Sequence, residues 1–351
     1  MPGTCGRRWS PPPGRWPRTA SSSSERPAAP RGDEPPGGTR PGGSGQPPTI
    51  NDVTTSGPTP ERGGARRPER VLAGLLAAAC AVGVLVLWYA LIYTRTGQLM
   101  EDAALTGSRI GERFIDTHAR ALLSTVSMPA AVALVLLILL LGLWRGSRRR
   151  AVGAAVAVVA INASTQLLKH QVLSRPDYGL SPRWDGANTL PSGHTAVAAS
   201  AAVALVLVVG PSLRGVAAWG GALLTAAMGY STLVCQWHRP ADVISAVLLA
   251  TAWGSLAVAC GIWQDEEPGG ARAVGPAGRG PDLVLLGGLG ALAGAVGLLL
   301  EAATWWAVVT GSGVLGRTGT FIAYAAGSAG TVAVSCACLA LLAGLAPARV
   351  R

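Results

Sequence analysis

The apolar part of the chain begins with VLAGLLAAACAVGVLVLWYALIY, residues 71–93, which contains no charged side chain. A helix needs about 20 apolar residues to cross the roughly 30 Å of hydrocarbon in a bilayer. This stretch is long enough, and similar stretches recur as far as the C-terminus. The sequence therefore predicts an all-α integral membrane protein.

The composition supports the same class. Of the 351 residues, 49% are hydrophobic and 13% are charged, whereas an ordinary soluble domain has about 25% charged residues. A soluble single-domain enzyme is therefore excluded. The net charge of +11 fits either nucleic acid or an anionic membrane surface. Because the basic residues gather in the N-terminal segment and beside the apolar stretches, we expect membrane lipids, and no nucleic acid, as partners.

Residues 1–70 differ from the rest of the chain. They hold 15 prolines, 11 arginines and six acidic residues, without apolar periodicity. Such a segment buries too little surface to offset its ordering entropy, so it predicts a disordered cytoplasmic tail. No apolar stretch follows Met1, so we expect no signal peptide and insertion through the first span.

Eight spans are expected after this tail, with both termini in the cytoplasm of a multi-pass plasma-membrane protein. Residues 71–263 form a six-helix core, residues 264–282 a cytoplasmic linker, and residues 283–351 two additional helices with a short tail. The eight spans are 71–93, 126–144, 151–168, 195–213, 216–234, 243–263, 283–300 and 321–345. The orientation follows from arginines in the connections assigned to the inside, and residues 94–125 form a charge-balanced outer loop.

Two other outer connections, 169–194 and 235–242, also carry basic residues. The positive-inside rule places such residues on the cytoplasmic side, so these two connections break it. They contain Lys169, which is the only lysine of the chain, and three of its four histidines. A topology violation by basic residues invites a functional explanation. The alternative for Lys169 is a side chain that merely snorkels at the end of a span.

Three blocks occupy these connections: Lys169–Pro176 (KHQVLSRP), Pro191–His194 (PSGH) and His238–Asp242 (HRPAD). In this order they resemble the signature blocks of the type 2 phosphatidic acid phosphatase superfamily, over about residues 151–263. The resemblance implies a six-helix membrane core and a phosphatase that forms a phosphohistidine intermediate. It implies no required metal and no cofactor.

The chemistry of the residues agrees with this resemblance. Hydrolysis of a phosphate ester through a covalent step needs a nucleophile, an acid for the leaving oxygen and fixed positive charge. His238 is the candidate nucleophile, and Asp242, four residues later, can hold its imidazole in one tautomer. His194 is the candidate general acid. Asp242 could alternatively act only as the N-terminal charge of its helix.

The candidate phosphate-binding residues combine cations with a helix N-terminus. Lys169 and Arg175 supply positive charge. Ser192 and the backbone N–H groups of Gly193 and His194 lie where the dipole of the following helix favours an anion.

The blocks depart from the family pattern at two places. Five residues, not six, separate Lys169 from Arg175, although Pro176 disfavours helix at Arg175 and lets the chain absorb the difference. Thr232 stands where the family commonly has a phosphate-binding arginine, so it can donate a hydrogen bond but no charge. Arg239 and Arg183 are the candidate substitutes for the missing cation.

The sequence thus predicts a membrane lipid-phosphate phosphatase that hydrolyses a phosphatidate-like or polyprenyl (di)phosphate at the outer face. One alternative is a catalytically weak or inactive phosphate-binding or lipid-binding membrane module of the same fold. A solute transporter is a third reading, but no inverted repeat or broken mid-membrane helix supports it. The sequence leaves the oligomeric state open. The cysteines show no disulfide or metal-site spacing, and Gly287, Gly290, Gly294 and Gly297 form a stripe that predicts helix packing.

Overall fold

The computed structural model describes residues 67–124, 128–144, 147–180, 188–263, 280–311 and 315–345. The tail expected over residues 1–70 lies almost entirely outside these ranges, as do most of the expected linker 264–282 and the candidate residue Arg183. Every regular element in the described residues is helical, which confirms the predicted all-α class. In chain order they are α1 (Arg67–Leu87), η1 (Trp88–Tyr93), α2 (Arg95–Gly107), α3 (Arg109–Ser124), α4 (Met128–Trp144), α5 (Arg148–Leu167), η2 (Leu168–Val172), α6 (Gly193–Val208), η3 (Pro211–Leu213), α7 (Arg214–Val234), α8 (Pro240–Ala259), α9 (Pro281–Thr310) and α10 (Arg317–Gly344).

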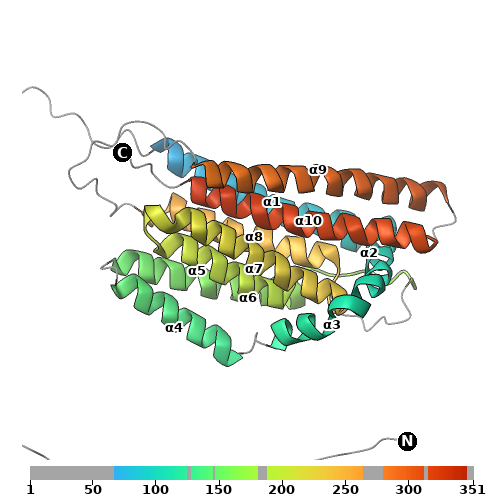
Figure 1. Ribbon diagram of the computed structural model, residues 1–351, viewed down its shortest axis with the longest axis horizontal. Coiled ribbons are helices and arrows are strands. Elements are labelled where there is room, and N and C mark those ends of the chain that lie inside the picture. The colour runs from blue at the N-terminus through green and yellow to red at the C-terminus, as the bar shows by residue number, and fades with distance from the viewer. Residues whose placement is uncertain are drawn as a thin grey trace, which may run out of the picture. The chain divides into compact units, whose positions relative to one another are not determined.

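Each expected span corresponds to a long helix, and the helices run side by side (Figure 1). Five stretches are long and apolar enough to cross a membrane: α1 with η1, α5 with η2, α8, α9 and α10. The structure therefore supports a membrane protein. The count of eight stays a prediction, because α4, α6 and α7 are not among the five; α6, for example, has 16 residues, a length of about 24 Å.

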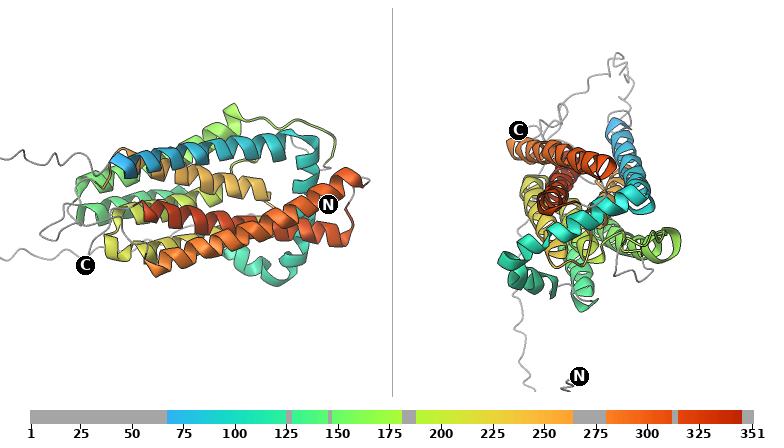
Figure 2. Two further views of the ribbon diagram at one scale, coloured as in Figure 1. Left: turned by 90° about the horizontal axis from the view of Figure 1, so that it is seen from above. Right: turned by 90° about the vertical axis from the view of Figure 1, so that its right-hand side faces the viewer.

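The expected outer loop 94–125 is largely helical instead. Thr94 caps α2, since its Oγ1 accepts a hydrogen bond from Gly97 N at 3.0 Å, and α3 follows after Ser108. Figure 2 shows both helices lying across one end of the bundle. Apolar side chains of α3, including Ala119 and Leu123, pack with Met228 of α7. These two helices cover the end at which the three sequence blocks meet.

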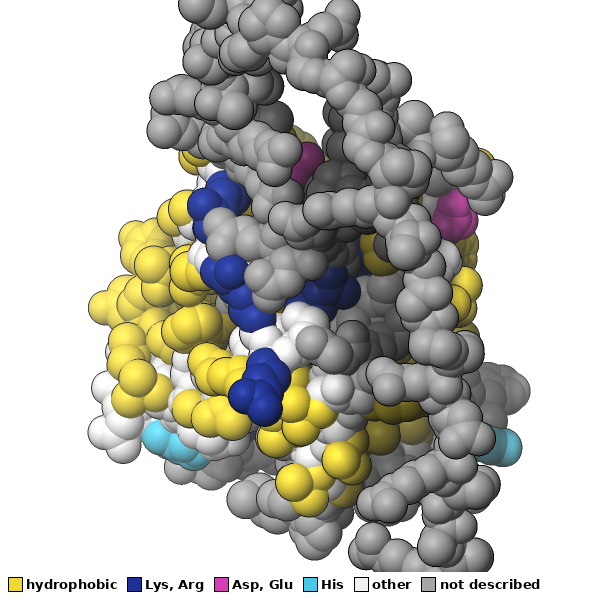
Figure 3. Space-filling model, turned by 90° about the vertical axis from the view of Figure 1, so that its left-hand side faces the viewer, with side chains coloured by type: hydrophobic (Ala, Val, Ile, Leu, Met, Phe, Trp, Pro, Cys, Tyr) yellow, Lys and Arg dark blue, Asp and Glu magenta, His cyan; other side chains and the backbone are white. Residues whose placement is uncertain are grey.

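The blocks meet there because of the direction of the helices. Helices α5 and α7 end at this side of the bundle, whereas α6 and α8 begin there (Figure 1). The opposite end carries arginines, and Figure 3 shows dark blue basic side chains on it. Arg148, Arg149 and Arg150 open α5 there, and Arg214 opens α7 with its guanidinium 4.3 Å from the centre of the Trp263 ring.

The glycine stripe of α9 packs against α10, as its spacing predicted. A Cβ on Gly290 would lie 2.7 Å from Ala337 N, and one on Gly297 would lie 3.2 Å from Gly330 N. The two backbones therefore approach too closely for a larger side chain at Gly290. Close approach of this kind lets helices associate in a bilayer, where apolar burial alone gives little driving force.

Adding one methyl group to α9 should have opposite effects at two neighbouring glycines. A Cβ on Gly288 would meet no atom within 4 Å, and alanine favours a helix over glycine by about 0.5–1 kcal/mol. At Gly290 the methyl group overpacks the contact with α10, which typically costs about 1–3 kcal/mol. We expect Gly290→Ala to lower the Tm of the detergent-solubilised protein and Gly288→Ala to keep or raise it. Equal Tm values for the two variants would contradict the close contact.

Candidate active site

His238 and Asp242 form a buried pair at the start of α8. The two atoms His238 Nδ1 and Asp242 Oδ2 lie 3.1 Å apart, and the two residues are 8% and 0% exposed. An ionised carboxylate only accepts hydrogen bonds, so Nδ1 donates and a neutral imidazole presents the lone pair of Nε2. Nε2 has no hydrogen-bond partner among the described residues. This is the arrangement that the four-residue spacing predicted.

A tight turn at the end of α7 presents His238. The Thr232 carbonyl accepts hydrogen bonds from Trp237 N at 3.0 Å and His238 N at 3.3 Å. Gln236 takes a positive φ of 56° inside this turn, a conformation that costs a residue with a Cβ roughly 1–2 kcal/mol. The Thr232 hydroxyl donates to Gly229 O at 2.7 Å. Thr232 therefore shapes the turn through its carbonyl, while its hydroxyl proton stays within α7.

The Pro-Ser-Gly-His block begins α6 beside this pair. Ser192 N donates to the Asp242 carbonyl at 2.8 Å, which joins the starts of α6 and α8. Ser192 Oγ caps α6 by accepting from Thr195 N at 3.4 Å. The N–H groups of Gly193 and His194 have no partner among the described residues. They lie at the start of α6, where the helix dipole favours an anion.

His194 is half-buried on the first turn of α6. Its ring packs against Trp237, with 5.3 Å between the ring centres. It interacts electrostatically with His238 and Lys169, so the candidate acid, the candidate nucleophile and the only lysine share one region. His170, by contrast, is exposed.

The connection that carries Lys169 and Arg175 leaves the helix early, as Pro176 predicted. Helix α5 passes into the π-helical turn η2, which ends at Leu173 with an extended backbone, and no regular element follows before α6 in the described residues. Lys169 is half-buried on this turn, and Arg175 is 9% exposed. Burial, and then the positive charge of Arg239, lower the pKa of Arg175 from its ordinary value.

The protein-family model described as PAP2 superfamily matches residues 150–265 of the chain. These residues are a PAP2 superfamily domain. The match contains all three blocks and confirms the resemblance to the type 2 phosphatidic acid phosphatase superfamily. No curated protein and no solved structure matches the chain. Since members of the superfamily are generally phosphatases, the domain indicates phosphatase activity on a lipid phosphate in a membrane.

Three polar residues of α2, outside the PAP2 domain, also belong to the site. Gln98 Nε2 donates to Pro176 O at 2.8 Å. Glu101 Oε2 accepts from Ala241 N at 3.1 Å, in the first turn of α8. Asp102 Oδ1 accepts from Arg239. From the sequence, Glu101 and Asp102 are expected only as two charges of the balanced outer loop 94–125. Their spacing with Gln98, at i, i+3 and i+4, was the available signal, because it places them on one helical face.

Arg239 is therefore paired with a carboxylate. Its Nε and Nη2 lie 2.9 and 2.7 Å from Asp102 Oδ1, and Arg175 Nη2 lies 3.7 Å from the same oxygen. The structure thus brings together nine of the predicted residues at one end of the PAP2 domain, and Arg183 lies outside the described residues. Those nine are Lys169, Arg175, Ser192, Gly193, His194, Thr232, His238, Arg239 and Asp242.

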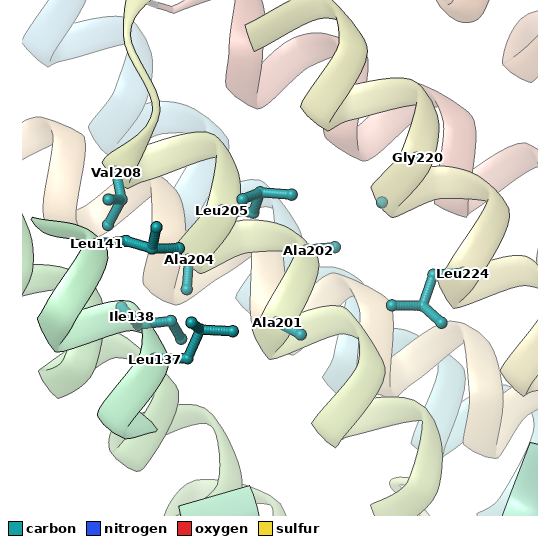
Figure 4. Close-up of a pocket in the computed structure, with 11 residues that line it drawn as sticks. Leu137, Ile138, Leu141, Ala201, Ala202, Ala204, Leu205, Val208, Gly220 and Leu224 are labelled. Carbon is teal, nitrogen blue, oxygen red and sulfur yellow. The ribbon is translucent and has the colours of Figure 1, made fainter. Parts of the chain in front are cut away.

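The described residues show no metal site, and their apolar pocket lies apart from the polar cluster. No group of three or more His, Cys, Asp or Glu in the described ranges could hold a metal ion. An apolar pocket of about 210 Å³ lies between α4, α6 and α7, lined by residues such as Leu137, Ala201 and Leu224 (Figure 4). Ala201 is seven residues along α6 from His194, a distance of about 10 Å. The pocket is therefore separate from the polar site.

Glu101 should make stability depend on pH. Burial, and then the carboxylates of Asp242 and Glu301, raise the pKa of Glu101 well above its ordinary value. The folded protein keeps this proton where the unfolded chain, with a pKa of about 4.3, has lost it. Stability should therefore fall as the pH rises from about 4.5 towards the folded pKa, by on the order of 1 kcal/mol per pH unit.

The Glu101→Gln variant keeps an oxygen for Ala241 N but cannot titrate. We expect the Tm of this variant to lack the pH dependence that the titration of Glu101 causes. The wild type should therefore lose stability relative to the variant as the pH rises. Parallel Tm curves of the two proteins between pH 4.5 and 8 would refute the assignment. Glu101→Leu, which removes the acceptor, should be less stable than Glu101→Gln at every pH.

Proposed function

We propose that the chain is a membrane lipid-phosphate phosphatase that works through a phosphohistidine at His238. The observation that carries this proposal is the His238–Asp242 pair, 3.1 Å apart, with an unpaired Nε2 among the described residues. The N–H groups of Gly193 and His194, which have no partner in the described part of the chain, lie at the same end of the bundle. A nucleophile, an acid and an anion-binding helix start are the groups that phosphate transfer needs.

In the first step, His238 Nε2 attacks the phosphorus atom. The N–P bond forms as the bond from phosphorus to the leaving oxygen breaks, and protonated His194 gives its proton to that oxygen. Asp242 stabilises the positive charge that develops on the His238 ring. The N–H groups of α6, with Lys169, Arg175, and Ser192 at the cap, hold the phosphate oxygens.

In the second step, water replaces the histidine. Neutral His194 takes one proton from the water as its oxygen bonds to phosphorus and the N–P bond breaks. This releases inorganic phosphate and returns His238 to its starting form. Burial, and then the charges of His238 and Lys169, lower the pKa of His194 from its ordinary value, which favours the neutral form that acts in this step. The negative charge of a bound phosphate favours the protonated form that the first step needs.

The proposed topology has eight spans in the plasma membrane. The arginine-rich end of the bundle lies in the cytoplasm by the positive-inside rule, together with both termini, the tail 1–70 and the linker 264–282. The active site then opens at the extracytoplasmic face. Residues 71–263 form the six-helix core, and residues 283–351 add two helices.

The proposed substrates are phosphatidate-like monoesters or polyprenyl (di)phosphates. Their hydrocarbon chains remain in the bilayer while the phosphate reaches the end of the helices. The proposed steps use side chains and backbone N–H groups of this chain, together with one water molecule.

A second candidate function is a phosphate-binding or lipid-binding module with weak or absent turnover. The observation in its favour is Thr232. Its hydroxyl is bonded within α7, at the position where related proteins commonly have a phosphate-binding arginine.

Substitution of His238 separates the two functions. Phosphate release by the purified protein is measured on phosphatidate, a polyprenyl diphosphate and a soluble phosphomonoester, with EDTA present. We expect release from a lipid substrate to fall by roughly 10³-fold or more in His238→Ala, because the nucleophile is lost. His194→Ala should also be inactive, and His170→Ala, an exposed histidine of the same connection, is the matched control. A folded wild type that binds phosphate but releases none would favour the binding module.

Gly193→Ala tests the approach of the phosphate to the start of α6. A Cβ at this position would meet only Gln166 Nε2, at 3.8 Å, so the Tm should not change. We expect the kcat/KM for the lipid phosphate to fall by roughly 10- to 100-fold, because a methyl group beside the N–H donors obstructs the oxyanion contact. Unchanged kinetics would show that the phosphate binds elsewhere.

A further inference from the structure

Helix α2 has one polar face, and it contacts two of the three blocks. Gln98, Glu101 and Asp102 lie on this face, at i, i+3 and i+4. Gln98 and Asp102 contact the Lys169–Pro176 block, and Glu101 and Asp102 contact the His238–Asp242 block. The PAP2 match begins at residue 150, so this face adds groups that the matched domain does not contain.

Asp102 joins two arginines through one oxygen. Arg239 Nε and Nη2 donate to Asp102 Oδ1 at 2.9 and 2.7 Å, and Arg175 Nη2 lies 3.7 Å from it. The side chains of Asp102, Arg239 and Arg175 are 22%, 12% and 4% exposed. Such desolvated, charge-assisted contacts fix geometry far better than exposed ion pairs do.

Arg239 also touches the catalytic pair through its backbone. Its N–H donates to Asp242 Oδ2 at 3.1 Å, the same oxygen that pairs with His238 Nδ1. The side chain of Arg239 therefore leaves the backbone next to the nucleophile His238, and Asp102 holds the guanidinium at its far end. Its Nη1 makes no hydrogen bond to any part of the chain that the structure describes.

The two guanidinium groups repel each other. A carboxylate between them offsets this repulsion and allows two cations to remain in one partly buried place. Two fixed arginines side by side suit a phosphate, whose oxygens spread negative charge over several positions. Thr232 supplies no charge there, so the site otherwise has one arginine only among its described residues.

We propose that Asp102 is a positioning residue that holds Arg239 beside Arg175 as the second fixed cation of the phosphate site. Arg239 thereby fills the role that Thr232 leaves open. The inference rests on the proposed function, because it assigns Arg239 to the phosphate of the same reaction.

The test is a double-mutant cycle on Asp102 and Arg239. Asp102→Asn keeps the shape of the side chain and removes its charge, and Arg239→Gln removes the cation. Asp177→Asn is the control, because Asp177 is an exposed acid of the same end whose only hydrogen bond among the described residues is to Gly179 N in its own turn. We expect each single variant to lower kcat/KM by roughly 10- to 100-fold. The double variant should be no worse than Arg239→Gln alone, because Asp102 acts through Arg239.

Two further variants distinguish positioning from general stability. Arg239→Lys keeps the charge but cannot keep both contacts to Asp102, so its kcat/KM should stay near that of Arg239→Gln with an unchanged Tm. Multiplicative losses in the double variant, or full activity of Arg239→Lys, would overturn the proposal. A gain in phosphate affinity in Asp102→Asn would also overturn it, since Asp102 would then compete with the phosphate. If Asp102→Asn does not fold, Arg239→Lys and Arg239→Gln still decide the result.

Binding of inorganic phosphate separates this inference from the proposed catalysis. The probe is the rise in Tm of each protein with added inorganic phosphate. A wild type that is inactive but stabilised by phosphate would overturn the catalytic proposal alone. The inference would then require that Asp102→Asn and Arg239→Gln both lose this stabilisation and that Asp177→Asn keeps it. A wild type that neither turns over substrate nor binds phosphate would refute both.

Discussion

The site is organised around Asp242, a residue without exposed surface that makes two contacts through one carboxylate oxygen and a third through its backbone carbonyl. Its Oδ2 pairs with the ring of His238 and accepts the N–H of Arg239, while its backbone carbonyl accepts the N–H of Ser192. A buried charge is costly unless it is paired and hydrogen-bonded. The two contacts of Oδ2 offset this cost and fix His238 and Arg239 at the start of α8. The bond from Ser192 N to the Asp242 carbonyl keeps the starts of α6 and α8 together, and the other groups of the site take their places relative to them.

The bilayer imposes a second constraint on the same arrangement. Charged and strongly polar side chains are costly inside the hydrocarbon, so an apolar helix bundle can carry a polar site most easily at its ends. Antiparallel helices then decide which segments meet. Because α5 and α7 end where α6 and α8 begin, blocks separated by up to about 70 residues form one cluster.

The sequence was sufficient for the parts of this arrangement that depend on local patterns. Apolar length predicted the helices, and the spacing from His238 to Asp242 predicted their contact. The sequence did not predict helix α2, because its residues are too polar for a span. Its partners also lie far along the chain, since Asp102 and Arg239 are 137 positions apart. No local periodicity reports such a contact. The pairing of Arg239 could therefore not be foreseen, although the residue itself was a candidate.

The position of α2 has a consequence for how the protein is divided into units. It packs against α10 and η1, and its residues Gln98, Glu101 and Asp102 contact the site. The family segment 150–265 thus receives its counter-charge from the helix before it and its support from the helix after it. The segment that matches the family therefore does not contain all of the groups that meet at its site, because Gln98, Glu101 and Asp102 come from outside it.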